Sequence, residues 1–304
     1  MRKLTALFLA FVMFMVMPTS TQASQSDWET AMHSALDYLY SAVSQNPQVG
    51  NEWAILALAR AERIAADEAW VTRWLNQLGR AQFRRKTDYQ RVSLALSSLG
   101  QDASNFRGRD FTKAFSTHVP TAQRHAMNQT INADIYALIA LDSRPYSGDR
   151  EYFIQSLLDA QRSNGAWGLT PNLPASALDL DITAMAVQAL APYYYSNPDV
   201  TLAIDTALEW LRKQAFNDPE GTAQMIVALT ALGPVFADEA LRYVNRLLLW
   251  FDPSSGGFRR PTTTSPVNFM ATEQAAYALV AYWRLVNNMT SLYDMTDVFN
   301  AGTN

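Results

Sequence analysis

The segment DLDITAMAVQALAPYY, Asp179 to Tyr194, places two carboxylates at the start of a helix that has almost no polar face. Apolar residues at helical spacing on most sides of a helix indicate that it is buried all round. The same phrase, a polar pair followed by an apolar helix with an Ala-Leu pair, occurs six times. The six copies are 51–61, 89–100, 131–142, 183–194, 222–233 and 272–283. Their spacing of roughly 40 to 50 residues is typical of helical-pair repeats.

Six amphipathic segments alternate with these apolar copies. They are 26–43, 67–83, 104–118, 149–161, 198–214 and 237–251. Each can bury only one stripe, whereas each apolar copy must be buried on all sides. Two concentric layers satisfy both needs, with the apolar helices inside. An open superhelix is the alternative, but it needs capping repeats and a polar concave face, and the sequence shows neither. The sequence therefore predicts an all-α fold, an (α/α)6 toroid of six helical hairpins, in a single domain over 24–304.

The first 23 residues have the pattern of a secretory signal peptide. A basic start, MRK, precedes the apolar run LTALFLAFVMFMVM, and Thr21-Gln22-Ala23 offers a small-residue cleavage site. The run is too short for a typical spanning helix, although an uncleaved N-terminal anchor is the alternative. No Cys follows it, so a lipoprotein anchor is excluded. We therefore expect residues 1–23 to be removed and the protein to be secreted, either extracellular or in the cell envelope.

The composition excludes several classes of site. The chain has no Cys, so it has no disulfide, no thiolate nucleophile and no Cys-ligated zinc. Its three His residues, His33, His118 and His125, have no metal-ligand spacing, and neither a metal nor a cofactor is expected. The net charge of −4 is spread along the chain without a basic run after the leader. Nucleic acid is therefore not an expected partner.

Polar residues collect at the starts of the six apolar helices. In a closed ring the inner helices run parallel, so their N-termini and the positive ends of their dipoles meet at one end. A pocket with apolar walls and a few polar groups is the usual form of a ligand site. The candidate ligand-binding residues are Glu52, Trp53, Tyr89, Gln90, Asp134, Tyr136, Trp167, Asp179, Asp181, Thr183 and Glu273. Helix capping is the alternative for each Asp or Thr taken alone.

Two further segments carry a structural signal. QRSNGAW, Gln161 to Trp167, ends an amphipathic helix, and we expect Gly165 to make a turn and Trp167 to join neighbouring hairpins. DPSSGGF, 252–258, is a degraded copy of it. This copy lies in a long loop, 251–274, that could be a lid over the rim, a docking arm or a simple excursion into solvent.

These motifs resemble those of a known group of proteins. QRSNGAW resembles the QW repeat of squalene and terpene cyclases, and DLDITAMA resembles their catalytic Asp-x-Asp-Asp-Thr-Ala motif. DLDITAMA is also similar to the Asp-Thr-Ala-Ala-Met-Ala segment of transcobalamin-type vitamin B12 carriers, whose α-domain is a toroid. Nearly the whole chain after the leader resembles exported bacterial prenyltransferase/squalene-oxidase-repeat proteins, which are terpene-cyclase-like. In a cyclase the resemblance would make Asp181 the general acid and Asp179 the first Asp of the motif, while Ile182 replaces the third.

Three functions follow as expectations. The first is a secreted binder of a small hydrophobic or amphipathic ligand, isoprenoid-like or corrinoid, with an apolar cavity and a polar rim. The second is a terpenoid cyclase or mutase that uses Asp181 as general acid. The third is an interaction module whose outer face or loops bind a cell-envelope protein. Protein prenyltransferase β-subunits and complement-type thioester domains each need a Cys, so their chemistry is excluded.

Overall fold

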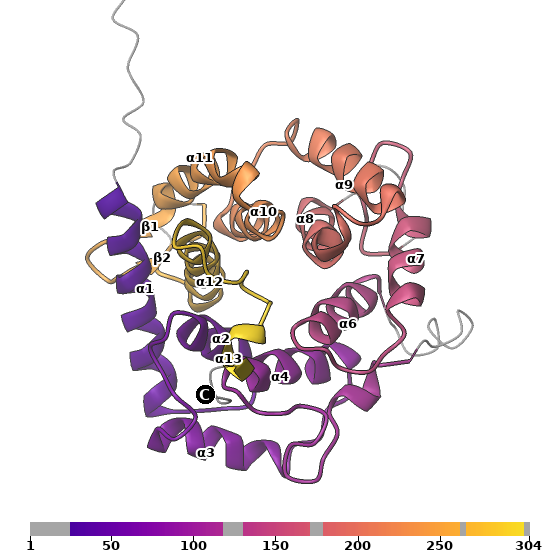
Figure 1. Ribbon diagram of the computed structural model, residues 1–304. Coiled ribbons are helices and arrows are strands. Elements are labelled where there is room, and N and C mark those ends of the chain that lie inside the picture. The colour runs from indigo at the N-terminus through magenta and orange to yellow at the C-terminus, as the bar shows by residue number, and fades with distance from the viewer. Residues whose placement is uncertain (1–24, 118–129, 171–178, 262–265, 301–304) are drawn as a thin grey trace, which may run out of the picture.

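Nearly all regular structure in the computed structural model is helical (Figure 1). The structure describes residues 25–117, 130–170, 179–261 and 266–300. The expected leader at 1–23, His118 and His125 lie outside the described residues. Within the described ranges the strands β1 (Phe251–Asp252) and β2 (Gly257–Phe258) form one short antiparallel hairpin. The all-α fold class is therefore confirmed.

Six helices form an inner layer around a common centre (Figure 1). They are α2 (Glu52–Arg60), α4 (Lys86–Ser98), α6 (Asn132–Asp142), α8 (Leu180–Leu190), α10 (Pro219–Ala231) and α12 (Phe269–Val286). Each packs against the next in chain order, and α12 packs against α2. Most residues of each of these helices are buried, and every residue of α10 from Pro219 to Thr230 is buried. The sequence feature that predicts this burial is the lack of a polar face in most of these helices.

Five amphipathic helices lie outside this layer in the described part of the chain (Figure 1). They are α1 (Gln25–Gln45), α3 (Ala69–Leu78), α7 (Arg150–Ala160), α9 (Pro198–Leu211) and α11 (Ala237–Leu247). In α11 only Ala240, Val244 and Leu247 are buried, at the spacing of one helix face. Short 3₁₀ helices complete the path: η1 (Thr112–Ala114), η3 (Ala191–Tyr193), η4 (Pro234–Phe236) and η5 (Leu248–Trp250).

The helix predicted over 104–118 is wrong for the described residues of that range. Turns, a bridge between Phe106 and Arg109, and η1 take its place. Arg107 and Gly108 both have positive φ, which a right-handed helix does not allow. The Asp110 carboxylate then accepts hydrogen bonds from the backbone N–H of Thr112 at 2.8 Å and of Lys113 at 3.0 Å. Such side-chain bonds offer the backbone an alternative to the helix.

The C-terminal segment packs on one end of the inner layer. Residues 290–300, which include the helix α13 (Thr296–Asn300), cross the C-terminal ends of the inner helices (Figure 1). The Asp297 carboxylate accepts hydrogen bonds from the guanidinium groups of Arg60, at 2.8 Å, and Arg284, at 2.5 Å. Both arginines are 1% exposed, whereas the Asp297 side chain is 33% exposed, so the ion pair is buried on its arginine side. The backbone N–H of Met295 donates to the carbonyl of Ser143, at the C-terminal end of α6.

The QRSNGAW segment joins neighbouring helices through hydrogen bonds. The Gln161 amide donates to the carbonyl of Ala203 on α9 at 2.8 Å, and the Trp167 indole donates to the carbonyl of Leu157 on α7 at 2.8 Å. Gly165 has φ +90, and a Cβ there would lie 2.4 Å from the carbonyl oxygen of Thr206. Only glycine fits this approach of the loop to α9.

The QRSNGAW segment and its degraded copy, 252–258, share a second hydrogen bond. The backbone N–H of Trp167 donates to Thr183 Oγ1 on α8 at 3.0 Å, and that of Phe258 donates to Thr272 Oγ1 on α12 at 2.8 Å. Each aromatic residue is thereby tied to the start of the inner helix that follows it. The described part of the long loop also contacts the protein through Arg260, which donates to Glu220 on α10 at 2.8 Å.

No helix in the described ranges combines the length and the apolar character needed to cross a membrane.

Candidate functional site

The first turns of the inner helices lie at one end of the molecule, which we call the mouth. The backbone N–H of Ala54 on α2 donates to Glu273 Oε1 on α12 at 3.0 Å. The Gln90 amide on α4 donates to the carbonyl of Ala133 on α6 at 2.7 Å. A Cβ on Gly221, in the first turn of α10, would lie 2.8 Å from Asp181 Oδ1 on α8. Polar residues that are distant in sequence therefore share this end.

Glu52 and Glu273 form a buried carboxyl pair at the mouth. Glu52 is 1% exposed and Glu273 is 7% exposed. Burial, together with the neighbouring Glu52 carboxylate and against the Ala54 hydrogen bond, raises the pKa of Glu273 to about 7. Burial also raises the pKa of Glu52. The nearest cation is Arg91, whose Nη2 lies 3.9 Å from Glu52 Oε2 and 2.9 Å from Asp88 Oδ1.

Asp179 and Asp181 have different roles at the start of α8. Asp179 caps the helix, because its Oδ1 accepts hydrogen bonds from the backbone N–H of Asp181 at 2.9 Å and of Ile182 at 3.1 Å. The half-buried Asp181 faces the start of α10. Burial, with smaller contributions from the carboxylates of Asp179, Asp218 and Glu220, raises the pKa of Asp181 to about 7. Capping thus accounts for Asp179, whereas Asp181 remains a candidate functional acid.

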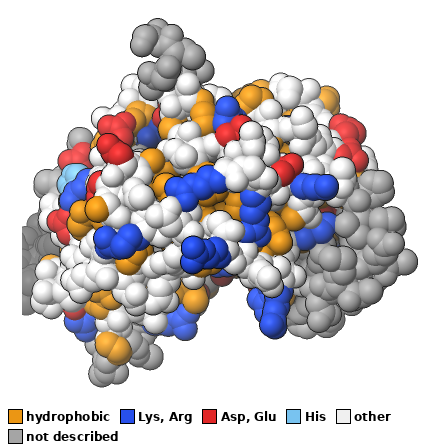
Figure 2. Space-filling model, turned by 90° about the horizontal axis from the view of Figure 1, so that it is seen from below, with side chains coloured by type: hydrophobic (Ala, Val, Ile, Leu, Met, Phe, Trp, Pro, Cys, Tyr) orange, Lys and Arg blue, Asp and Glu red, His pale blue; other side chains and the backbone are white. Residues whose placement is uncertain are grey.

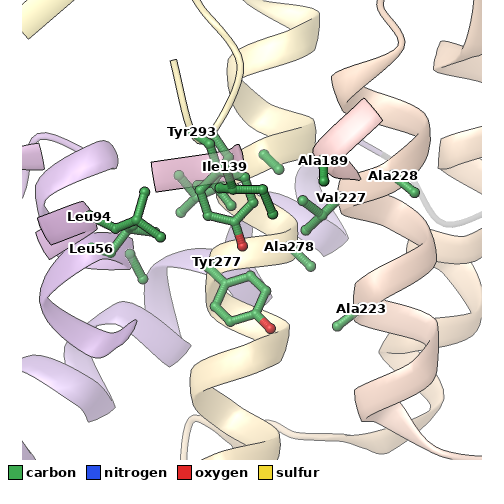
Figure 3. Close-up of a cluster of buried hydrophobic side chains, with 14 of the residues drawn as sticks. Leu56, Leu94, Ile139, Ala189, Ala223, Val227, Ala228, Tyr277, Ala278 and Tyr293 are labelled. Atoms are coloured by element: carbon green, nitrogen blue, oxygen red, sulfur yellow. The ribbon is translucent and has the colours of Figure 1, made fainter. Parts of the chain in front are cut away.

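Four aromatic side chains meet inside the inner layer. The Trp53 ring centroid lies 5.4 Å from that of Tyr136, 6.0 Å from Tyr277 and 6.5 Å from Tyr293. Figure 3 shows Tyr277 and Tyr293 among apolar side chains of several inner helices. Tyr277 and Tyr293 are buried, whereas Trp53 and Tyr136 are half-buried. Trp53 and Tyr136 are therefore still reached by solvent.

Five of the predicted residues hold the layers together or lie apart from the aromatic cluster. Tyr89 packs on Phe83, with ring centroids 5.1 Å apart, toward the irregular segment that precedes α6. Gln90, Thr183 and Trp167 are buried and hydrogen-bonded to neighbouring backbone. Asp134 accepts a hydrogen bond from Ser156 Oγ on α7 at 2.6 Å. These contacts have a structural role, so the mouth is formed chiefly by Glu52, Trp53, Tyr136, Asp181 and Glu273.

Three contributors were not identified from the sequence. Met185 is half-buried and its sulfur lies 3.5 Å from the Tyr136 hydroxyl. Tyr277 accepts a hydrogen bond from the Gln224 amide at 2.5 Å. Tyr277 follows Glu273 by one helical turn, a spacing that places both on one face and could have indicated it. Tyr293 lies outside every repeat, and no sequence pattern indicates it.

A small cavity lies at the opposite end of the inner layer. Its volume is about 50 Å³, and its lining includes Ile139, Gln188, Pro192 and Tyr293. The Oε1 atom of Gln188 is buried without a hydrogen bond among the described residues. A volume of this size suits one or a few water molecules rather than an isoprenoid or a corrinoid.

The charge is not evenly spread along the chain, because basic residues gather between 73 and 113. Residues 73–113 contain nine Lys or Arg and three Asp or Glu. Arg80, Arg84 and Arg107 are exposed in this stretch. Figure 2, viewed from the side of α3, shows several basic side chains on that face. Within the described ranges, no group of three or more His, Cys, Asp or Glu side chains could hold a metal ion.

Comparison with known proteins identifies no family for this chain, since no family model matches it and no curated protein is significantly similar to it.

Proposed function

We propose that the chain is an (α/α)6 toroid that binds a small apolar or amphipathic ligand at the mouth. The ring of packing from α2 through α12 and back to α2 supports the toroid. The irregular residues 101–117 take the place of the third outer helix in this arrangement. The expected leader, 1–23, would export this binder, so the ligand would be met outside the cytoplasm.

One observation carries the ligand proposal. Trp53, Tyr136 and Met185 belong to inner helices, yet each keeps a partly exposed side chain beside buried carboxyls. An inner layer with no function at its mouth would bury such large apolar groups, because each exposed apolar Å² costs about 25 cal/mol. Aromatic walls with a few polar groups suit an isoprenoid-like or corrinoid ligand.

The experiment measures bound ligand directly. Native mass spectrometry of protein purified from its own host should show a mass above that of the chain. Farnesol and cobinamide are then titrated while tryptophan fluorescence is followed, and a ligand at the mouth should quench the Trp53 contribution. Trp53→Phe should abolish this quenching, and Trp210→Phe on the outer helix α9 is the matched control. A chain without bound ligand, and without quenching by either probe, would contradict the proposal.

A terpenoid cyclase is a second candidate because of the state of Asp181. Its pKa of about 7 keeps a large fraction of the carboxyl protonated at neutral pH, as a general acid requires. Asp181 is also the residue that matches the acid in the resemblance. Incubation with squalene tests this candidate. A cyclic product that Asp181→Asn abolishes and Asp199→Asn preserves would support it, and the absence of any cyclic product would remove it.

A further inference from the structure

Glu52 has a buried oxygen that accepts no hydrogen bond. Its Oε1 accepts from the backbone N–H of Gly50 at 2.7 Å, but its Oε2 has no hydrogen-bond donor among the described residues. The side chain is 1% exposed, so bulk water does not replace the missing donor. A buried acceptor without a partner is costly, and most are satisfied by protein, water or ligand. This oxygen therefore points to a donor that arrives from outside the chain.

The charges around this oxygen favour a cation. Glu52 and Glu273 repel each other when both are ionised, and Asp88 lies near enough to raise the pKa of Glu52 further. Arg91 is the cation that opposes them; its Nη2 lies 3.9 Å from Glu52 Oε2, beyond hydrogen-bond distance, and 2.9 Å from Asp88 Oδ1, which it binds. Asp179 and Asp218 add further negative charge around Asp181, where the nearby Glu220 is paired with Arg260. Positive charge is therefore under-supplied on this side of the mouth.

Aromatic rings adjoin the same carboxyl pair. Glu273 and Tyr277 are one turn apart on α12 and share a face, and Glu273 acts electrostatically on Tyr277. The Trp53 ring lies 6.0 Å from the Tyr277 ring and is partly exposed. Ring faces attract cations, and the attraction is strongest for tryptophan. Carboxyls and ring faces at one place are complementary to an organic cation with an apolar body.

We propose that the mouth recognises a primary amine, whose ammonium group binds Glu52 and Glu273 and whose apolar body lies against Trp53 and Tyr136. This inference rests on the proposed ligand-binding function and specifies its ligand class. An ammonium group supplies N–H donors for Glu52 Oε2 as well as the missing charge. A neutral alcohol supplies only the donor, and a carboxylate supplies neither.

Three probes with one apolar body separate these requirements. Hexylammonium, hexanol and hexanoate are titrated into the full chain at about pH 8 by isothermal calorimetry. We expect hexylammonium to bind at least about tenfold more tightly than hexanol, because a hydrogen bond to a charged partner is stronger than a neutral one. Hexanoate should not bind measurably.

Charge-removing variants locate the site. Glu52→Gln and Glu273→Gln should each weaken hexylammonium by about tenfold and weaken hexanol by less, because the alcohol loses no charge–charge attraction. Glu209→Gln, an exposed carboxylate on α9 that pairs with Lys213, should change neither and serves as the control. Each variant is checked for its thermal midpoint, so that loss of fold is not read as loss of binding.

The outcomes distinguish this inference from the proposed function. Equal affinity for the three probes, or an unchanged hexylammonium affinity in both Glu variants, would overturn the amine specificity and leave an apolar binding site. Failure of all three probes to bind the folded chain would also contradict the amine inference. It would contradict the ligand site itself only if farnesol and cobinamide fail to bind as well.

Discussion

Replacing Glu273 by Gln should stabilise the protein, and only at neutral to basic pH. The carboxyl is 7% exposed, and its pKa rises from 4.5 to about 7 on folding because of burial and the neighbouring Glu52 carboxylate. A raised pKa of an acid means that the folded chain holds the proton more tightly than the unfolded chain. The contribution of Glu273 to the free energy of unfolding is therefore greatest below about pH 4.5, and it falls as the pH rises toward about 7. A glutamine amide is never ionised, so E273Q avoids this loss.

The magnitude follows from the pKa. At about 1.4 kcal/mol per pKa unit, ionised Glu273 costs up to about 3 kcal/mol, and a glutamine side chain can still accept the hydrogen bond from Ala54. E273Q should thus be about 2 to 3 kcal/mol more stable than wild type near pH 8.5, and within about 0.5 kcal/mol of it near pH 4. In a domain of this size the gain corresponds to a rise in Tm of roughly 4 to 8 °C.

Urea and thermal unfolding at both pH values, followed by circular dichroism, provide the assay. Glu209→Gln removes an exposed carboxylate and should show no comparable pH-dependent gain. A variant E273Q that is less stable than wild type near pH 8.5 would refute the reasoning. So would a stability difference that is the same at both pH values.

Three further predictions test other parts of the structure. Gly165→Ala should lower the unfolding free energy by about 2 kcal/mol or more, because its Cβ would meet the Thr206 carbonyl at 2.4 Å, and urea unfolding measures this loss. Asp297→Ala should lower it by about 3 kcal/mol, because two buried arginines lose their carboxylate, and faster proteolysis of residues 290–300 should accompany the loss. Expression in a secreting host should yield a chain that begins at Ser24, as intact mass will show, whereas retention of residues 1–23 would contradict the predicted leader.

The inner layer could be predicted because most of its helices have no polar face in the sequence. A helix such as α10, with no polar face, must be surrounded by other elements, and the structure buries it from Pro219 to Thr230. The starts of these helices could be located from their polar pairs only to within three residues: α2 and α6 start one residue after the predicted position, and α4, α8, α10 and α12 start three residues before it. Glu52 and Glu273 were therefore both identified as residues of helix starts.

The contacts between the helices could not be read from the sequence. Ala54 and Glu273 are 219 residues apart, and only the packing of α12 on α2 brings them together. The irregular path of 104–117 was missed because its apolar residues fit a helical spacing. Its fold depends on positive φ at Arg107 and on the Asp110 side chain, which spacing alone does not reveal.

The C-terminal segment was missed for a different reason. Residues 290–300 contain no motif and little apolar periodicity. Their position depends on Asp297, which binds two arginines from helices at opposite ends of the sequence. An ion pair between residues so far apart in sequence depends on the tertiary structure. The charged Arg60 and Arg284 within apolar helices could have indicated that each needs a partner.

The distance between the starts of α2 and α12 tests the closed ring, on which the mouth depends. The chain has no Cys, so Gln48→Cys and Met270→Cys introduce the only two sites for spin labels, both on exposed residues. Neighbouring packed helices lie about 10 Å apart, so a double electron–electron resonance experiment should give a distance of about 25 Å or less. In an open row of six inner helices the first and last would lie about 50 Å apart, and a distance in that range would contradict the closed ring and the site built on it.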